Sequence, residues 1–249
     1  LCVVSCTNRD KIVDKEDIYE GDFRLFQETP VWELAKAVQD QKVSKIKRLV
    51  KEEKLDVDFQ ESKYGNTLLM LAVKNEKYQS CETLLELGAD PNKPNNHSGS
   101  SAMIDAAAIN TTIGSDTKFL KLLLEHGGDP NYVEVGERKK GINTRNTPLI
   151  VACGYVDNFT KSPINKVKVL VEAGADVNYE NDLSGFALRT ALFQENYDIV
   201  LYLLKNGADY TKVIIDKSEI TNDGKKLYIV DVLRRDIHSL ESDKYKQMM

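Results

Sequence analysis

The sequence of 249 residues is poor in the side chains from which metal sites and histidine-dependent active sites are built. It contains three histidines, His97, His126 and His238, and none lies at a metal-ligand spacing from a cysteine or another histidine. It also lacks a glycine-rich phosphate loop, a nucleophile elbow and a Ser-His-Asp set. We therefore expect no catalytic residue, no metal site and no cofactor.

Long apolar runs and an excess of positive charge are also missing. No apolar stretch approaches the roughly 20 residues that span a bilayer. The formal net charge is −5, whereas proteins that bind nucleic acids usually have a basic balance or a basic face. Apolar residues make up 41% of the chain and charged residues 29%, which is typical of a folded soluble protein.

Four cysteines are present, and they fall into two pairs of different character. Cys81 and Cys153 lie inside apolar helical patterns, where a free cysteine packs as a small hydrophobic residue. We expect both to be buried and to form no disulfide. Cys2 and Cys6 lie at the start of the chain and are considered below.

One short phrase built around Gly, Asp and a following Asn or Thr recurs four times. Its copies are Leu87–Asn92, His126–Asn131, Ala173–Asn178 and Asn206–Thr211. A leucine- or valine-rich stretch precedes each copy, and a weaker copy ends at Asp58. The glycine of each phrase favours the left-handed conformation that ends a helix, and the Asp that follows favours a turn.

A second signature opens another helix a few residues later. Thr67, Ser101 and Thr147 precede apolar stretches, and their hydroxyl groups are expected to cap the helices. Pro148 stands at the first helical position, where a missing N–H costs nothing. Helices of roughly ten residues are too short to be stable alone in water, so the units must stack.

These motifs resemble the ankyrin repeat over roughly residues 29–209. Thr147-Pro148-Leu149 and Gly174–Asn178 are near-complete copies of its opening and closing patterns. The resemblance implies an all-α solenoid of about four full repeats with β-hairpin-like fingers, capped by residues 29–58 and 212–249. Leu227–Leu233 is expected to form the final helix. The family's histidine is absent from every repeat, and Asp105 occupies a usually apolar position.

The repeats depart from a regular period through insertions that all fall in loops. The finger from Tyr132 to Asn146 is enlarged, as are the helix-to-helix loops at 110–116 and 154–163 and the connection 212–225. Val133–Arg145 could form a hairpin that projects over the surface. Its basic residues either meet an acidic patch of a partner or are simply solvated. They are Arg138, Lys139, Lys140 and Arg145.

In ankyrin proteins, partners usually contact the finger tips and the exposed side of the first helix of each repeat. The matching positions here are Lys63, Tyr64, Asn66, Lys74, Asn75, His97, Ser100, Ile109, Asn146, Leu183, Phe193 and Gln194. Tyr64, Tyr132 and Phe193 are the candidate aromatic anchors, since binding hot spots favour large aromatic residues. A half-buried packing role is the alternative for each.

The first six residues carry a separate signal. Val3-Val4-Ser5-Cys6 resembles a bacterial lipobox, in which the cysteine becomes lipidated, and a polar stretch follows it. Residues 1–20 would then be a signal remnant and a tether, and residues 21–249 the repeat domain. The protein would be anchored in a bacterial cell envelope through Cys6. The alternative is a buried strand or frayed terminus, which would favour a cytoplasmic location.

Together these features predict a monomeric module that binds another protein. An immunity protein or inhibitor that neutralises a toxin or an enzyme is the alternative within that class. Nucleic-acid binding and catalysis come after both, because neither a basic surface nor an active-site motif accompanies the repeats. The identity of the partner does not follow from the motifs.

Overall fold

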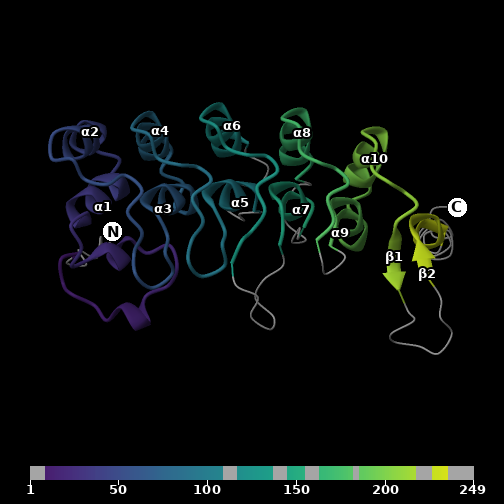
Figure 1. The fold of residues 1–249 in the computed structure, drawn as a ribbon, viewed down its shortest axis with the longest axis horizontal. Helices are drawn as coiled ribbons and strands as arrows, with labels where there is room; N and C mark the ends of the chain where they lie inside the picture. Colours follow the sequence, from purple (N-terminus) through teal and green to yellow (C-terminus); the bar gives the residue numbers. More distant parts are fainter. Residues whose placement is uncertain are drawn as a thin grey trace, which may run out of the picture.

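The computed structural model describes residues 9–108, 117–136, 145–154, 163–181, 185–216 and 226–234. Within these ranges ten α-helices form five antiparallel pairs in two rows (Figure 1). The inner row contains α1 (Trp32–Gln39), α3 (Leu68–Lys74), α5 (Ala102–Ala107), α7 (Pro148–Ala152) and α9 (Ala187–Phe193). The outer row contains α2 (Val43–Lys51), α4 (Tyr78–Glu86), α6 (Lys118–Glu125), α8 (Ile164–Glu172) and α10 (Tyr197–Lys205).

This arrangement confirms the predicted helical solenoid. Each helix packs on its partner and on the corresponding helix of the next pair, and the fingers project on the side opposite the outer row (Figure 1). None of the helices in the described ranges has the length and apolar character needed to cross a bilayer.

Two of the three predicted hydroxyl caps form at the starts of the inner helices. The hydroxyl oxygens of Thr67 and Thr147 each accept a hydrogen bond from a backbone N–H three residues later, at 3.3 Å. Pro148 lies in the first turn of α7. The expected cap by Ser101 is wrong, because its buried hydroxyl makes no such bond. Burial of the apolar residues that follow therefore holds the start of α5.

Apolar side chains from all five pairs form one continuous core that runs from Ile18 to Val232. Cys81 and Cys153 are buried in it and free, as predicted. Burial raises the pKa of the Cys81 thiol to about 12 and that of Cys153 further, so both stay protonated.

An asparagine ladder joins the later helix pairs. Asn131 donates a hydrogen bond from Nδ2 to the carbonyl oxygen of Gly174 (3.0 Å) and accepts one at Oδ1 from the N–H of Asp176 (2.7 Å). Asn92 and Asn178 bind the same two backbone groups of the repeats that follow them. Each side chain therefore fixes the offset between two successive repeats.

The ladder changes at both ends. Asp58 replaces asparagine at the first junction and only accepts, from the N–H of Asp90 at 3.0 Å. Thr211 stands at the last position and bonds to Asp209 within its own turn. Lys54 takes the place of the helix-ending glycine with a φ of 59°, in the left-handed region that favours glycine.

The N-terminal segment packs against the first helix pairs. Residues 9–31 contain the short 3-10 helices η1 (Lys15–Asp17) and η2 (Phe23–Phe26). Gln27 donates hydrogen bonds to the carbonyl oxygens of Arg9 (2.7 Å) and Lys11 (3.0 Å), and Ile18 joins the core. Residues 9–20, which the sequence assigns to a tether, are held to the repeats by buried apolar and amide groups. Residues 1–8, including Cys6, lie outside the described residues.

The C-terminal cap begins with a hairpin. Strands β1 (Val213–Asp216) and β2 (Lys226–Tyr228) pair antiparallel, and residues 229–234 are helical. The predicted helix therefore starts two residues later than residue 227. Leu227 and Tyr228 belong to the strand because β1 supplies backbone partners for it, with Ile215 opposite Leu227.

We predict that Asp58→Asn stabilises the protein. The variant keeps the acceptor for the N–H of Asp90. It also adds an amide donor that corresponds to the one with which Asn131 reaches a glycine carbonyl. It also removes a carboxylate whose pKa is raised by burial, an effect that the hydrogen bond from the N–H of Asp90 offsets only in part. We expect the free energy of unfolding in urea to increase by about 1 kcal/mol. The matched change Asn131→Asp should lower it by a similar amount, and equal stability of all three chains would contradict this role of the ladder.

Candidate protein-binding surface

The fingers and the exposed ends of the inner helices form what we call the finger surface (Figure 1). A side-chain acceptor three residues after each ladder position shapes the finger that follows. Glu61 is buried and accepts hydrogen bonds from three backbone N–H groups of residues 63–66 at 2.7–3.0 Å. Asn95 accepts three from residues 97–99 at 2.8–3.2 Å. Glu134 and Asn181 occupy the same position and also accept finger N–H groups.

Sequence reasoning missed these acceptors. Their fixed spacing from the ladder positions was the signal that could have revealed them. Because a charged or amide group folded beneath a loop satisfies several backbone donors at once, it makes the finger rigid before a partner arrives.

The predicted contact residues of the first two fingers differ in accessibility. Asn66 and Ser100 are buried, so their side chains offer no surface to a partner. The amide of Asn66 bonds instead to Asn95, at 3.3 Å. His97 is exposed and meets the ring of half-buried Tyr64 edge-on, with 5.7 Å between ring centroids.

The remaining predicted contact residues of this region already bond to other groups of the chain. Lys63, Tyr64, Lys74 and Asn75 all bond to groups in residues 15–21 of the N-terminal segment. Neither the repeat pattern nor the charge distribution predicted these contacts.

The two described ends of the enlarged finger meet at its base. The backbone N–H of Glu134 bonds to the carbonyl oxygen of Asn146 at 3.1 Å, and Arg145 donates to the carbonyl oxygen of Glu134 at 3.1 Å. Tyr132 is half-buried and donates its hydroxyl proton to the carbonyl oxygen of Gly99. Its contact therefore joins neighbouring fingers.

Some of the predicted contact residues and insertions lie outside the described residues. They are Arg138, Lys139, Lys140, Ile109, Leu183 and the inserted residues 110–116 and 155–162.

The end of α9 presents the most exposed of the three candidate anchors. Phe193 is 51% exposed, and the guanidinium of Arg189 lies 5.3 Å from the centroid of its ring. Gln194 follows it and is also exposed. The equivalent positions of α5 and α7 carry Ala108 and Gly154, so the aromatic ring is particular to the last repeat.

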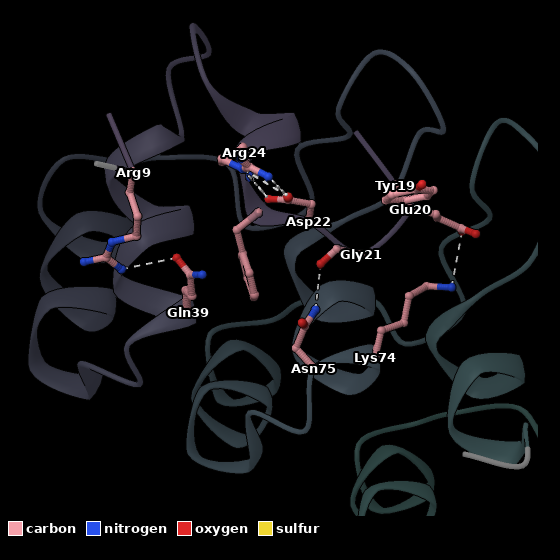
Figure 2. Close-up of a pocket in the computed structure, with 10 residues that line it drawn as sticks. Arg9, Tyr19, Glu20, Gly21, Asp22, Arg24, Gln39, Lys74 and Asn75 are labelled. Carbon is pink, nitrogen blue, oxygen red and sulfur yellow. Dashed lines mark hydrogen bonds and ion pairs between the residues drawn. The ribbon is translucent and has the colours of Figure 1, made fainter. Parts of the chain in front are cut away.

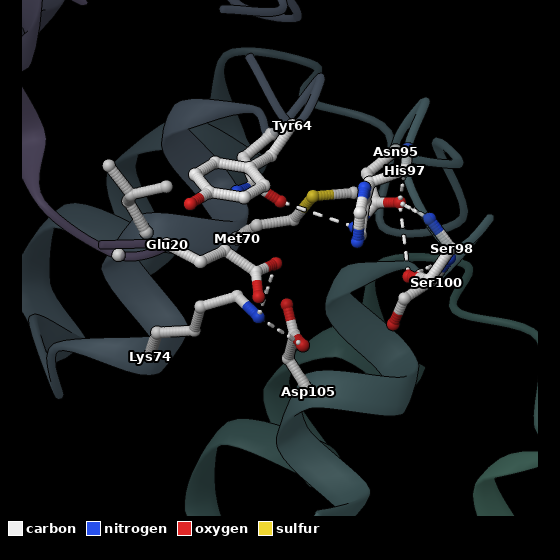
Figure 3. A network of polar contacts seen from close by, with 12 residues as sticks. Glu20, Tyr64, Met70, Lys74, Asn95, His97, Ser98, Ser100 and Asp105 are labelled. Carbon is white, nitrogen blue, oxygen red and sulfur yellow. Dashed lines mark hydrogen bonds and ion pairs between the residues drawn. The ribbon is translucent and has the colours of Figure 1, made fainter. Parts of the chain in front are cut away.

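A group of three charges spans α3, α5 and the N-terminal segment (Figure 3). Lys74 Nζ lies 2.8 Å from Asp105 Oδ1 and 3.2 Å from Glu20 Oε1. Asp105 Oδ2 is buried without a hydrogen-bond partner. Burial raises the pKa of Asp105, and Lys74 offsets only part of that effect. Burial opposes the charge of Lys74 as well, but the two carboxylates outweigh it and raise its pKa.

A cavity of about 570 Å³ lies beside this group, between residues 19–24 and the C-terminal ends of α1 and α3 (Figure 2). Its volume is in the range of small-ligand sites. The basic groups that line it are all paired within the chain: Arg9 with Asp40, Arg24 with Asp22, and Lys74 with Glu20. Within the described ranges, no group of three His, Cys, Asp or Glu side chains could hold a metal ion.

Known proteins share this architecture. The family profile described as ankyrin repeats in three copies matches residues 12–95 and 106–214. An ankyrin repeat protein of Acanthamoeba polyphaga mimivirus is 29% identical over 157 residues, which cover 57% of this chain and 26% of that protein. The transient receptor potential cation channel subfamily A member 1 of Homo sapiens is 25% identical over 175 residues, covering 70% of this chain and 14% of the channel.

Among solved structures, the crystal structure of EF0377, an ankyrin repeat protein, superposes with a TM-score of 0.59 and 27% identity. The match covers 84% of this chain and 94% of that chain. By contrast, this chain spans about a quarter or less of the length of the two curated relatives.

We predict that Lys74→Met destabilises the protein because it leaves Asp105 buried without a counter-charge. The free energy of unfolding should fall by about 3 kcal/mol at neutral pH. Adding Asp105→Leu should restore most of it, since Leu71 and Val151 occupy the equivalent positions of α3 and α7.

The pH dependence provides a second measurement on the Lys74→Met chain. A carboxyl group whose pKa is raised by folding contributes stability below its unfolded pKa of about 3.9, and that contribution is lost as the pH rises through the folded pKa. Urea unfolding should therefore show the single variant gaining stability relative to the double variant as the pH is lowered from neutral. A parallel response of the two chains would contradict this assignment.

Proposed function

The chain belongs to the ankyrin repeat family, and we propose that it binds a partner protein through its finger surface, with Phe193 as an anchor. Ankyrin repeats are protein–protein interaction modules, and proteins of this family are generally non-enzymatic scaffolds.

The exposure of Phe193 is the observation that supports this proposal. A phenyl ring half exposed to water gains free energy when a partner covers it, and aromatic residues dominate binding hot spots. Arg189 holds one side of the ring and so limits its freedom before binding. His97 and the apolar Val135, which is 55% exposed, extend the accessible surface toward the earlier fingers.

We predict that Phe193→Ala weakens partner binding by about 30-fold, which corresponds to a hot-spot loss of about 2 kcal/mol. The partner would first be captured from the native host on the immobilised chain and identified by mass spectrometry. Its affinity for each variant would then be measured by calorimetry.

Leu201→Ala provides the matched control. Leu201 is 53% exposed, close to the value for Phe193, but it lies on the outer helix α10. We expect its removal to change the affinity less than threefold. Equal losses for the two variants, or none for Phe193→Ala, would remove Phe193 from the binding site.

We also propose that Cys6 is a lipid attachment site that places the repeats at a bacterial envelope. The support is the sequence Val3-Val4-Ser5-Cys6 and the polar residues after it. In that location a partner that proved to be a toxin or an enzyme would make the chain its immunity protein or inhibitor.

Cys6→Ala should release the protein from the membrane fraction of a bacterial host and remove the acyl mass from its N-terminal peptide. Cys81→Ala is the control, since the Cys81 thiol is buried and should not affect fractionation. Unchanged fractionation of Cys6→Ala, with no acyl mass on the wild-type peptide, would end the anchoring proposal.

A further inference from the structure

Residues 14–21, which we call the strap, lie across the first full finger and the end of α3. Lys63 is the centre of the contact. Its ammonium group donates hydrogen bonds to the backbone carbonyl oxygens of Lys15 (2.9 Å), Glu16 (2.8 Å) and Ile18 (3.2 Å). Three carbonyls thus satisfy the three protons of one lysine.

The strap also binds the other accessible side chains of this repeat. The hydroxyl of Tyr64 donates to the carbonyl oxygen of Ile18 at 3.2 Å. Asn75 Nδ2 donates to the carbonyl oxygen of Gly21 at 2.8 Å, and Glu20 pairs with Lys74 (Figures 2 and 3). The strap therefore occupies the surface of this repeat at which ankyrin proteins meet their partners.

These contacts have the character of a bound peptide. The hydrogen bonds from the repeat go to backbone carbonyls, which any peptide offers. Two side chains of the strap add specificity. Ile18 is buried in the core cluster, and the carboxylate of Glu20, two positions later, pairs with Lys74. Tyr19 between them is 86% exposed.

Departure of the strap leaves no buried charge unpaired in the repeat. Lys74 keeps its closer contact with Asp105 when Glu20 leaves. Lys63 would return to water, where an ammonium group is well solvated. The surface is therefore able to exchange one peptide for another.

We propose that the strap is a built-in competitor, and that the surface beneath it binds an acidic peptide of the partner carrying an apolar residue two positions before a carboxylate. This deepens the proposed function by naming the chemistry of one partner segment, and it rests on that function. Because the strap is joined to α1 by a short connection, it competes at an effective concentration in the millimolar range. The partner binds fully only after displacing it.

Gly21 provides a way to weaken the strap without altering the surface. Its φ is +110°, a conformation that side chains other than glycine rarely adopt, and it ends the strap at the bond to Asn75. Gly21→Val should therefore strain the attached strap in the full-length chain. Hydrogen exchange of the strap amides reports whether it has opened, and Ile18→Asp serves as a second opening variant.

The binding test uses a synthetic peptide with the sequence of residues 12–24, titrated to millimolar concentration against isotope-labelled full-length chains. We expect Gly21→Val to bind it at least tenfold more tightly than the wild-type chain. The amide resonances of Lys63, Tyr64 and Asn75 should shift. Adding Lys63→Met to Gly21→Val should weaken binding at least tenfold, and a peptide carrying Ile18→Asp should not bind.

Two results would overturn the proposal. One is an opened strap, shown by hydrogen exchange in either opening variant, without peptide binding at these residues. The other is equal binding of the peptide by the wild-type and opened chains, since the strap would then not compete. Neither result depends on Phe193 or on the natural partner, so failure here is distinct from failure of the proposed function.

Discussion

A single side-chain amide at each junction of the later repeats sets the register between those repeats. The helices have five to nine residues and would not persist alone, so they depend on their neighbours. Asn131 bonds both to the carbonyl of Gly174 and to the N–H of Asp176, although the intervening repeat is the longest of the chain. Inserted residues are therefore tolerated only in the fingers and the helix-to-helix loops, where they leave the junction unchanged.

The two ends of the ladder need other contacts, and the chain provides a different one at each end. Thr211 cannot bind a following repeat, and the hairpin β1–β2 continues the core there instead. At the first junction Asp58 makes only half of the usual contact. The N-terminal segment covers the adjoining helices with buried apolar residues such as Ile18 and Phe23. The same N-terminal segment therefore caps the stack and covers part of the finger surface.

The features that recur along the sequence could be predicted from it, whereas the contacts made to backbone groups could not. Thr67, Thr147 and Pro148 identified helix starts because their side chains or rings act on the local backbone. The strap escaped prediction because Lys63 binds carbonyl oxygens, and every residue has one. Asn66 matched a contact position by alignment, yet it is buried, since its amide joins the acceptor beneath the next finger. Burial of this kind depends on tertiary packing, which motif spacing does not encode.

The proposed anchor and the strap lie at opposite ends of the finger surface, and this separation has a consequence for binding. Phe193 is open in the free chain, whereas the surface around Lys63 is occupied. A partner that first engages the last repeat would hold its acidic segment close to the strap, so that the second contact becomes intramolecular. Competition would then be between two tethered segments. A partner offering only one of the two features would bind more weakly, because it would face the strap alone or leave the anchor unfilled.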